Sequence, residues 1–428
     1  MHNKLELKDK KVVVAGLARS GVASAILLKN EGACVFVSDI KDDIDTRKNK
    51  EDLGRYAIEV ELGKHSPYLF ENADLIVASP GVKYDAKCLN WARAKNIPII
   101  SEIELAAGLC PAAVIAVTGT NGKSTTTALI GEILKSTGRK VHICGNIGKA
   151  FCGEIAKIAK DDIVSLEVSS FQLETIVNFK PRVSVILNFN RNHLDRHKDL
   201  EEYLSAKKRI FMNQDKGDWT VLNKDDSVIR NLACETQAEV KFFESLLNIN
   251  GLRLNANQVA ALRVSEIFNV ACEDALRAIS NFKGLEHRAE FVDTISGVDF
   301  INDSKATTVD SCAWALSNIY KPVILIAGGR DKGADFSPMR DLVRRKVKTL
   351  ILIGEAKEKI KDAYRGITPI IEAQTFKQAV YTAGNIACEG DCVLLSPMCA
   401  SFDMFRDYEE RGRVFREIVG ELKNYAQG

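Results

Sequence analysis

The sequence predicts an α/β protein made of three successive blocks of strands and helices. Short runs of apolar, β-branched residues alternate with helix-like stretches along nearly the whole chain, as in βαβ units with parallel sheets. At 11–30 and again at 114–134, such a run leads through a glycine-rich turn into a helical pattern. With 428 residues, the chain is long enough for two or three domains.

The first block opens with a strand at 11–15, a turn that begins at Gly16, a helix, and a second strand that ends at Asp39. This order is typical of a Rossmann-like dinucleotide site, where an acid about twenty residues past the glycines binds a ribose hydroxyl. Ala18 replaces the second glycine of that pattern. A nucleotide without the pyrophosphate geometry of NAD therefore fits at least as well.

A further strand at 74–78 leads into the turn Ser79-Pro80-Gly81. Open α/β sheets bind ligands at the carboxyl ends of their strands, so this turn is a candidate ligand contact. A plain connecting turn explains it equally well. We predict that the first domain covers residues 1–101.

The second block carries the most informative segment, Gly-Thr-Asn-Gly-Lys-Ser-Thr at 119–125, between a strand at 114–117 and a helix. Backbone N–H groups of such a turn surround phosphate oxygens, Lys123 adds a positive charge, and the Ser124 hydroxyl can reach Mg²⁺. Val117 stands where the general P-loop pattern has its first glycine. The setting nevertheless predicts a site for a nucleoside triphosphate.

Further strands are expected at 163–168, 183–187 and 219–222. Glu167 ends the first of them, and a carboxylate beside a phosphate loop is the usual second ligand of Mg²⁺. His193 follows the second strand, where it could bind metal, orient a substrate, or be purely structural. The Asn-Lys-Asp-Asp sequence at 223–226 matches a guanine-reading pattern, but no Asp-x-x-Gly switch exists anywhere in the chain. A GTPase is therefore disfavoured, and we assign residues 102–284 to a central domain.

The third block, 285–428, has strand patterns at 323–327, 350–353 and 392–395. Its segments 303–307 and 328–333 mix acids, lysine and small residues, as phosphate and carboxylate sites do. Arg288 could present its guanidinium to a nucleotide phosphate.

Composition narrows the class of protein. The formal net charge of +2 gives no basic excess for nucleic-acid binding. No apolar run approaches the ~18 residues of a membrane span, and the start is polar, so neither membrane insertion nor a signal peptide is expected. The 11 cysteines are scattered and never spaced Cys-x-x-Cys. Reduced thiols in a cytoplasmic protein are the simplest interpretation, with Cys144, Cys152 and Cys399 as small buried apolar residues.

Six segments together resemble the Mur ligase family, the ATP-dependent amide ligases of bacterial cell-wall synthesis. They are residues 119–125, 145–148, 167–173, 188–195, 287–288 and 303–307, in the same order and spacing across almost the whole chain. Segments 328–336 and 396–403 resemble the branch that adds D-glutamate, and the Asp-Asn-Pro-Arg sequence of the diaminopimelate-adding branch is absent. The resemblance implies a Rossmann-like N-terminal domain for a UDP-sugar, a central P-loop ATPase-like domain, and a C-terminal Rossmann-like domain for the amino acid.

The implied reaction joins D-glutamate to UDP-N-acetylmuramoyl-L-alanine through an acyl phosphate made with ATP. Two anions must meet in its first step, so Lys123 and Mg²⁺ would neutralise charge. Two ions are implied, one held by Ser124 and Glu167, the other by His193 and a carbamylated Lys207. Carbamylation needs a neutral amine and thus a lowered lysine pKa. We therefore expect Lys207 to be buried, whereas Lys208 and Arg209 are expected on a solvated face. Catalytic roles are implied for Lys123, His193, Lys207 and Lys305, in an enzyme expected to be a monomer.

The resemblance also implies the binding residues. Nucleotide contacts would come from Gly119, Thr120, Asn121, Gly122, Lys123, Ser124, Thr125, Asn257, Arg288 and Asp303. Substrate contacts would come from Arg19, Ser20, Asp39, Ile40, Ser79, Gly81, Asn146 and His193 for the UDP-sugar, and from Thr307, Lys332, Ser401 and Tyr408 for D-glutamate.

Some positions depart from the family pattern. Asn192 replaces an acid before the metal histidine, Arg253-Leu254 replaces a His-Asn pair, Tyr408 stands where Phe is common, and the segment between 243 and 252 is short. Three alternatives therefore stay open at this point: a sibling or folylpolyglutamate-synthase-like ligase, a nucleotide-binding protein without catalysis, and an NAD-dependent dehydrogenase.

Overall fold

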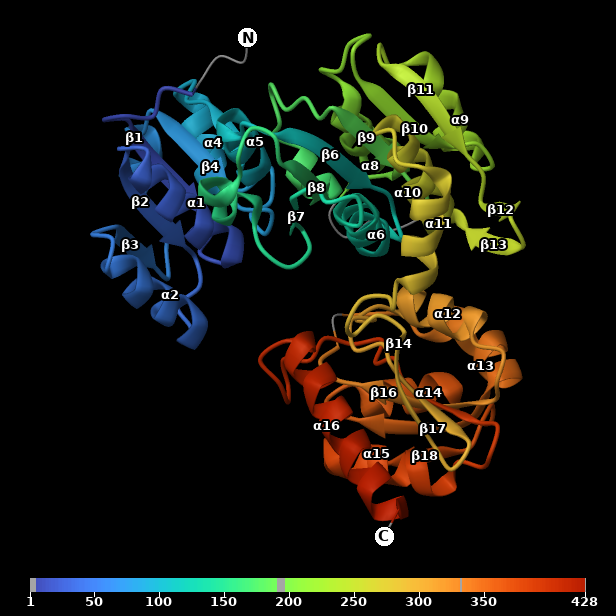
Figure 1. Cartoon of the computed structure of the whole chain (residues 1–428). Helices are drawn as coiled ribbons and strands as arrows, with labels where there is room; N and C mark the ends of the chain where they lie inside the picture. The colour runs from blue at the N-terminus through green and yellow to red at the C-terminus, as the bar shows by residue number, and fades with distance from the viewer. Residues whose placement is uncertain (1–4, 191–196, 332, 428) are drawn as a thin grey trace. The chain divides into compact units, whose positions relative to one another are not determined.

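A computed structural model describes residues 5–190, 197–331 and 333–427 of the chain. It contains three large sheets, coloured blue, teal to green, and orange in Figure 1. The chain divides into two compact units, Met1–Phe282 and Lys283–Gly428. The first unit holds two of the large sheets and the second unit holds the third.

The first sheet has five strands in the order β3-β2-β1-β4-β5, and every pair in it is parallel. Its strands are β1 (Lys11–Ala15), β2 (Cys34–Asp39), β3 (Glu59–Leu62), β4 (Leu75–Ala78) and β5 (Ile99–Ser101). The helices between them are α1 (Arg19–Asn30), α2 (Ile44–Gly54), α3 (Pro67–Glu71) and α4 (Lys87–Ala94). The apolar runs of the sequence therefore predicted three strands of this Rossmann-like sheet, β1, β2 and β4, and missed the short strands β3 and β5.

The central sheet has six parallel strands in the order β11-β10-β9-β6-β8-β7. They are β6 (Ala113–Thr118), β7 (Val141–Gly145), β8 (Ile163–Glu167), β9 (Val183–Ile186), β10 (Trp219–Asn223) and β11 (Glu239–Phe243). The accompanying α-helices are α5 (Glu102–Leu109), α6 (Lys123–Lys135), α7 (Ser170–Leu173), α8 (Leu200–Lys208), α9 (Ser227–Asn231), α10 (Ala256–Ile267) and α11 (Cys272–Asn281). A short antiparallel hairpin of β12 (Leu246–Ile249) and β13 (Leu252–Asn255) begins in the segment between 243 and 252, which is shorter than the family pattern predicts.

One hydrophobic core joins the first sheet to the central sheet. It combines residues of β1 such as Val12 and Val14 with residues of β6 such as Val114 and Ala116. Their neighbours Ile115 and Val117 point to the other face of β6, into a separate core shared with α6, α10 and α11. Because the two sheets share a core, they form a single compact unit although each has its own βαβ topology.

The third sheet has the order β14-β15-β19-β16-β17-β18. Its strands are β14 (Glu290–Ile295), β15 (Val298–Asn302), β16 (Val323–Gly328), β17 (Val347–Ile353), β18 (Ile370–Glu372) and β19 (Cys392–Leu395). All pairs are parallel except β14 with β15. The expectation of a purely parallel sheet was therefore wrong at this edge. Ser296 and Gly297 both have positive φ, 49° and 77°, which is typical of the tight turn of a hairpin.

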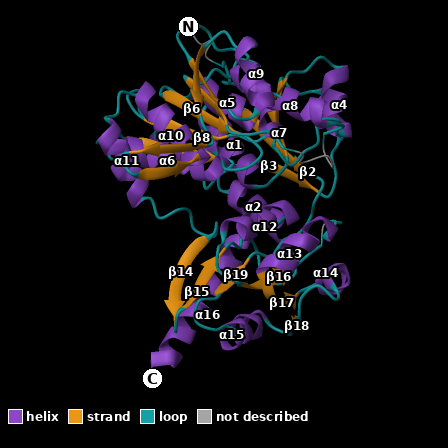
Figure 2. Ribbon diagram, turned by 90° about the vertical axis from the view of Figure 1, so that its right-hand side faces the viewer, coloured by secondary structure: helices purple, strands orange, loops and turns teal. Residues whose placement is uncertain are grey.

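Helices cover both faces of the third sheet (Figure 2). Val323, Leu325 and Ala327 of β16 face α12 (Val309–Asn318), α13 (Arg340–Lys346) and α14 (Lys357–Tyr364). The alternate residues Ile324 and Ile326 face α15 (Phe376–Ile386) and α16 (Tyr408–Gln427). This doubly covered sheet matches the predicted fold class, α/β throughout. Within the described part of the chain, none of the helices combines the length and apolar character needed to cross a bilayer.

Candidate functional site

The phosphate loop leaves β6 and ends at the first turn of α6, as the sequence predicted. Gly119 and Gly122 have φ of 152° and 82°, conformations that favour glycine. A Cβ on Gly119 would lie 2.9 Å from the Leu187 Cβ, and one on Gly122 would lie 2.2 Å from the Asn257 Oδ1. The loop therefore packs tightly against the end of β9 and against α10. This packing brings the expected adenine contact, Asn257, beside the expected phosphate cradle.

An asparagine amide holds the middle of this loop. Asn188 accepts a hydrogen bond from the Asn121 backbone N–H at 2.8 Å and donates to the Asn121 carbonyl at 3.1 Å. The Thr120 hydroxyl accepts from the Asn190 backbone N–H at 3.0 Å. These contacts hold the backbone of the loop from the segment that follows β9.

Two lysine ammonium groups meet at the loop. Lys123 donates to the carbonyl oxygens of Gly119 and Thr120 at 3.1 and 2.9 Å. Lys207, in the last turn of α8, donates to the same Gly119 carbonyl at 2.8 Å. The two residues lie far apart in the sequence, and the fold brings their amino groups to the same loop carbonyl at the carboxyl end of β6.

Lys207 is 1% exposed, so the expectation that it is buried is confirmed. Its Nζ lies 4.4 Å from the centre of the Tyr203 ring. Burial, with a smaller contribution from the charge of Lys123, holds the pKa of Lys207 well below its ordinary value. Burial therefore favours the neutral amine, which is the form that carbamylation needs. Arg209, two residues after Lys207, is half-buried and donates to the Leu173 and Ile176 carbonyls, so its expected placement on a solvated face was wrong.

Glu167 lies at the end of β8, the strand next to β6, and is 1% exposed. The Asn146 side chain donates to Glu167 Oε1 at 2.8 Å, and the Asn146 backbone N–H donates to the Glu167 carbonyl at 2.9 Å. Ser124, at the start of α6, is fully buried. A buried carboxylate and a hydroxyl at one sheet edge are the hard oxygen donors that Mg²⁺ prefers, so these residues fit a magnesium ion. Among the described residues, no group of three or more His, Cys, Asp and Glu side chains forms a metal centre.

Six of the expected UDP-sugar residues end or follow strands β1, β2 and β4 of the first sheet, whereas Asn146 follows β7 of the central sheet. Arg19 and Ser20 begin α1, and Ile40, which follows β2, is 61% exposed. Asp39 accepts from the backbone N–H groups of Leu17 and Lys41 at 2.6 and 2.8 Å. Its carboxylate thus shapes the turn between β1 and α1 from the neighbouring strand.

The turn after β4 packs closely on the same place. Ser79 is buried and its hydroxyl donates to the Gly16 carbonyl at 3.1 Å, while Gly81 has open space around it. A Cβ on Gly21 would lie 1.9 Å from the Gly16 carbonyl oxygen, so α1 approaches β1 as closely as a glycine allows. Close helix–strand packing is what the third glycine of a dinucleotide fingerprint provides.

In the third sheet, Asp303 lies just beyond β15 and is 7% exposed. It accepts from the Ala289 backbone N–H at 3.1 Å and from the Ser396 hydroxyl at 2.9 Å. Burial raises the pKa of Asp303 to about 7, although these hydrogen bonds and the Arg288 charge act in the opposite direction. This carboxyl is therefore poised to change charge near neutral pH.

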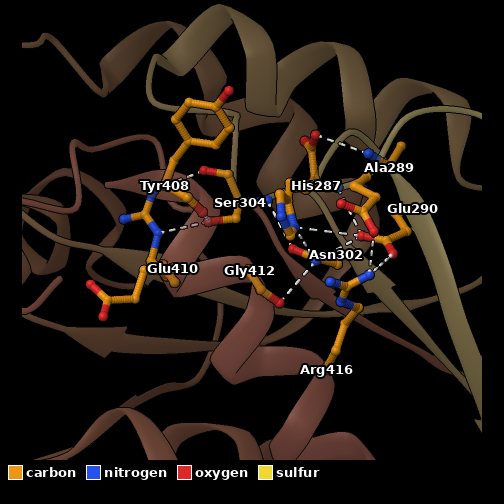
Figure 3. A network of polar contacts seen from close by, with 12 residues as sticks. His287, Ala289, Glu290, Asn302, Ser304, Tyr408, Glu410, Gly412 and Arg416 are labelled. Carbon is orange, nitrogen blue, oxygen red and sulfur yellow. Dashed lines mark hydrogen bonds and ion pairs between the residues drawn. The ribbon is translucent and has the colours of Figure 1, made fainter. Parts of the chain in front are cut away.

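A polar network behind Asp303 connects the start of β14, the end of β15 and α16 (Figure 3). The Asn302 amide nitrogen lies 2.9 Å from His287 Nδ1 and donates to Glu290 at 2.9 Å and to the Gly412 carbonyl at 3.1 Å. Arg416 pairs with Glu290 at 3.2 Å. Burial lowers the pKa of His287, although the nearby Glu290 carboxylate acts in the opposite direction.

Among the described residues expected to bind D-glutamate, Tyr408 begins α16, and Thr307 and Ser401 follow β15 and β19. Lys305 Nζ lies 5.1 Å from the centre of the Tyr408 ring, and the Tyr408 carbonyl accepts from the Ser304 hydroxyl at 2.8 Å. Ser401 is buried, whereas Thr307 is partly exposed. The fold therefore brings these residues to the carboxyl edge of the third sheet. His193 and Lys332, two further expected site residues, lie outside the described residues.

Sequence reasoning missed two buried groups at these sites. Tyr203 is 1% exposed under Lys207, and its helical pattern gave no sign of that position. Arg411 is also 1% exposed, and it donates to the Ser304 hydroxyl at 3.0 Å and to the Ser304 carbonyl at 2.8 Å. It lies in the sequence Glu-Glu-Arg-Gly, which reads as a solvated charge run, so no local signal could have identified it.

Comparison with known proteins covers nearly the whole chain. Three family models match in succession: the Mur ligase MurD-like N-terminal domain at residues 10–101, the Mur ligase middle domain at 117–271, and the Mur ligase glutamate ligase domain at 287–399. A protein of Koribacter versatilis named UDP-N-acetylmuramoylalanine–D-glutamate ligase is 41% identical, with 98% of this chain and 99% of that protein covered. The chain belongs to the Mur ligase family.

Other relatives agree with this assignment. A Thermoanaerobacter protein of the same name is 41% identical over 98% of this chain and its own full length. Among solved structures, UDP-N-acetylmuramate-alanine ligase of Thermotoga maritima matches with a TM-score of 0.61 at 19% identity, covering 97% of this chain and 100% of that one. A pseudomurein peptide ligase type C of Methanothermus fervidus matches with a TM-score of 0.58 at 20% identity, with the same coverage. At these identities the structural matches show the fold, which is that of a three-domain Mur ligase.

Proposed function

We propose that this Mur ligase uses ATP to join D-glutamate to UDP-N-acetylmuramoyl-L-alanine through an acyl phosphate, in the synthesis of peptidoglycan precursors. The observation that carries the proposal is the full-length match to proteins named for this reaction. The glycine-rich loop and the buried lysine beside it supply the matching chemistry.

The phosphate loop would bind ATP through residues 119–125, with Asn257 at the adenine and with Arg288 and Asp303 at the phosphates or ribose. Lys123 would move its ammonium from the loop carbonyls to the phosphate oxygens, because a doubly charged phosphate is a stronger acceptor. The substrate carboxylate would attack the terminal phosphorus of ATP and displace ADP. The amine of D-glutamate would then attack the acyl carbon of the resulting anhydride, displace phosphate and lose a proton. Lys305, near Tyr408, would offset negative charge in this step.

Ser124 and Glu167 would hold one Mg²⁺, and His193 with a carbamylated Lys207 would hold a second. Bound Mg²⁺ supplies positive charge that lets two anions approach. For the carbamate, the neutral Lys207 amine bonds to the carbon of CO₂ and releases a proton, which turns a cation into an anionic oxygen ligand. The burial and lowered pKa of Lys207 support this step.

The substrates would divide among three domains, 1–101, 102–284 and 285–428. The UDP-sugar would contact Arg19, Ser20, Asp39, Ile40, Ser79, Gly81, Asn146 and His193, and D-glutamate would contact Thr307, Lys332, Ser401 and Tyr408. We propose that the enzyme works as a monomer in the cytoplasm.

The test mixes the purified chain with ATP, Mg²⁺, UDP-N-acetylmuramoyl-L-alanine and one amino acid at a time, and measures phosphate release and amide product. D-glutamate is expected to give product and the other amino acids little or none. Product with L-lysine, or equal rates with all amino acids, would overturn the substrate assignment. ATP binding without turnover would indicate a binding protein instead.

A further inference from the structure

Arg411 lies in the first turn of α16 and is 1% exposed. Its hydrogen bonds to described residues all go to neutral oxygens: the Ser304 hydroxyl at 3.0 Å, the Ser304 carbonyl at 2.8 Å and the Cys399 carbonyl at 3.3 Å. Its Nη1 atom is buried and donates to none of the described residues. A buried cation bound in this way is costly to the fold, so its position calls for an explanation beyond packing.

The Arg411 guanidinium connects two segments that carry residues expected to bind D-glutamate. Ser304 comes three residues before Thr307, and Cys399 comes two residues before Ser401. The donors of a guanidinium lie in one rigid, planar fork, so they fix the relative positions of their acceptors more closely than a flexible ammonium would. The separation of these two segments is therefore set by one side chain.

The Ser304 hydroxyl extends this connection to Tyr408, a third expected D-glutamate contact. A guanidinium can only donate hydrogen bonds, so the hydroxyl accepts from Arg411 and directs its own hydrogen elsewhere. The Tyr408 carbonyl accepts that hydrogen bond at 2.8 Å (Figure 3). Arg411 thus orients the hydroxyl that holds the backbone of Tyr408 at the start of α16.

The turn after β16 packs against the unpaired Nη1 atom. A Cβ on Gly329 would lie 3.3 Å from Arg411 Nη1 and 2.2 Å from the Ala400 carbonyl oxygen, so the turn approaches as closely as a glycine allows. The next residue, Arg330, exchanges two backbone hydrogen bonds with Ala400, at 2.9 and 3.3 Å. The turn at 328–330 is therefore held against the same group of residues.

The charge of Arg411 persists at neutral pH. Burial lowers the pKa of Arg411 to about 10, and the Asp403 carboxylate acts in the opposite direction. Asp403 itself accepts the Glu355 backbone N–H at 3.1 Å. A positive charge in low-dielectric surroundings attracts an anion more strongly than the same charge in water does.

We propose that Arg411 is a positioning residue for D-glutamate, which holds the segments around Ser304, Ala400 and Tyr408 in register and favours an amino acid with two carboxylates through its buried charge. This inference rests on the proposed function. Arg411 acts through Ser304 and the backbone of Cys399, and it does not need to touch the amino acid.

The experiment measures phosphate release by the full chain with ATP, Mg²⁺ and UDP-N-acetylmuramoyl-L-alanine while the concentration of D-glutamate is varied. Arg411→Met should raise KM for D-glutamate at least about tenfold, because the charge and all the hydrogen bonds of the guanidinium are lost. KM for the UDP-sugar should stay unchanged, because its expected contacts all lie in the first unit. Arg413→Met, which changes an exposed arginine of the same helix, is the matched control and should behave as wild type.

Arg411→Lys separates the two parts of the proposal. It keeps the positive charge but replaces the fork by a single ammonium, so its KM for D-glutamate should lie between those of wild type and Arg411→Met. A KM for D-glutamate in Arg411→Lys equal to that of wild type would overturn the positioning role.

The split between KM and kcat distinguishes positioning from structural support. A merely structural residue would lower kcat through loss of folded enzyme and leave both KM values unchanged, and that result would overturn the inference. If Arg411→Met does not fold, Ser304→Ala takes its place, because it removes only the hydroxyl between Arg411 and Tyr408.

Ser304→Ala should raise KM for D-glutamate several-fold and leave KM for the UDP-sugar unchanged. An unchanged KM for D-glutamate in this variant would overturn the inference and leave the proposed function intact. A wild type that makes no product with D-glutamate would overturn the proposed function, and this inference with it.

Discussion

Replacing Gly122 by alanine tests the link between the phosphate loop and the proposed adenine contact. Gly122 has φ of 82°, where a non-glycine residue costs about 1–2 kcal/mol. The new Cβ would also lie 2.2 Å from Asn257 Oδ1, so the Asn257 side chain must rotate away. If that side chain makes one or two hydrogen bonds to adenine, its displacement costs about 1–2 kcal/mol, or about tenfold in ATP affinity.

Gly138 offers a matched control for the backbone cost. It also has φ of 82°, but a Cβ there would meet nothing within 4 Å. Gly138→Ala should lower the free energy of unfolding by about 1–2 kcal/mol and leave ATP binding unchanged. Gly122→Ala should show a similar or larger loss of stability together with the drop in ATP affinity.

Urea unfolding measures the stabilities, and titration with a non-hydrolysable ATP analogue in the presence of Mg²⁺ measures the affinities. Asn257→Ala should lower ATP affinity without the loss of stability, and adding it to Gly122→Ala should cause little further loss. If Gly122→Ala binds the nucleotide as tightly as Gly138→Ala, the reasoning about Asn257 is refuted.

Three further predictions concern buried charges. Lys207→Met should reduce the rate of product formation at least about 100-fold and leave stability unchanged or higher, because a buried polar amine is replaced by an apolar chain. The control Lys208→Met should stay active, and an active Lys207→Met would exclude the carbamate. Burial raises the Asp303 pKa from 3.8 to about 7, so this group should lower the free energy of unfolding by about 3 kcal/mol as the pH rises from 4 to 7. Unfolding of wild type and Asp303→Asn across that range checks it, and parallel pH profiles would contradict it. The Glu104 carboxylate accepts hydrogen bonds from the backbone N–H groups of residues 177–179 at 2.7–3.0 Å, so Glu104→Gln should lower the free energy of unfolding by about 2–4 kcal/mol. The exposed change Glu132→Gln should leave it unchanged. Equal urea midpoints for the two variants would contradict a stabilising role of these hydrogen bonds.

The strands and the phosphate loop were predictable because their signals are local. The apolar run 114–117, followed by a glycine-rich turn, predicts a strand whose carboxyl end leads into the phosphate loop. The turn conformation at Gly122 follows from the need for positive φ at the start of the helix. Such features do not depend on what packs against them.

Features set by distant contacts were not predictable from single segments. Lys207 stands in a run of three cations, and only its resemblance to a family position distinguished it from Lys208. In the structure its amino group contacts the Tyr203 ring and the Gly119 carbonyl, which no local pattern indicates. Arg411 is buried because Ser304, over a hundred residues away, accepts its hydrogen bonds. The antiparallel edge strand β14 depends on a turn at 296–297 that the apolar pattern does not show.

The Glu104 carboxylate has a consequence for protein engineering. It belongs to the helix that follows the first sheet, yet its three acceptor bonds capture backbone at 177–179 in the central domain. A chimera that exchanges residues 1–101 with a related enzyme would therefore keep Glu104 and residues 177–179 in the same parent sequence. A junction after residue 109 would separate them and put these three hydrogen bonds at risk. Dividing the chain after Phe282, at the boundary of the two compact units, would leave these hydrogen bonds intact and is the better choice for producing fragments separately.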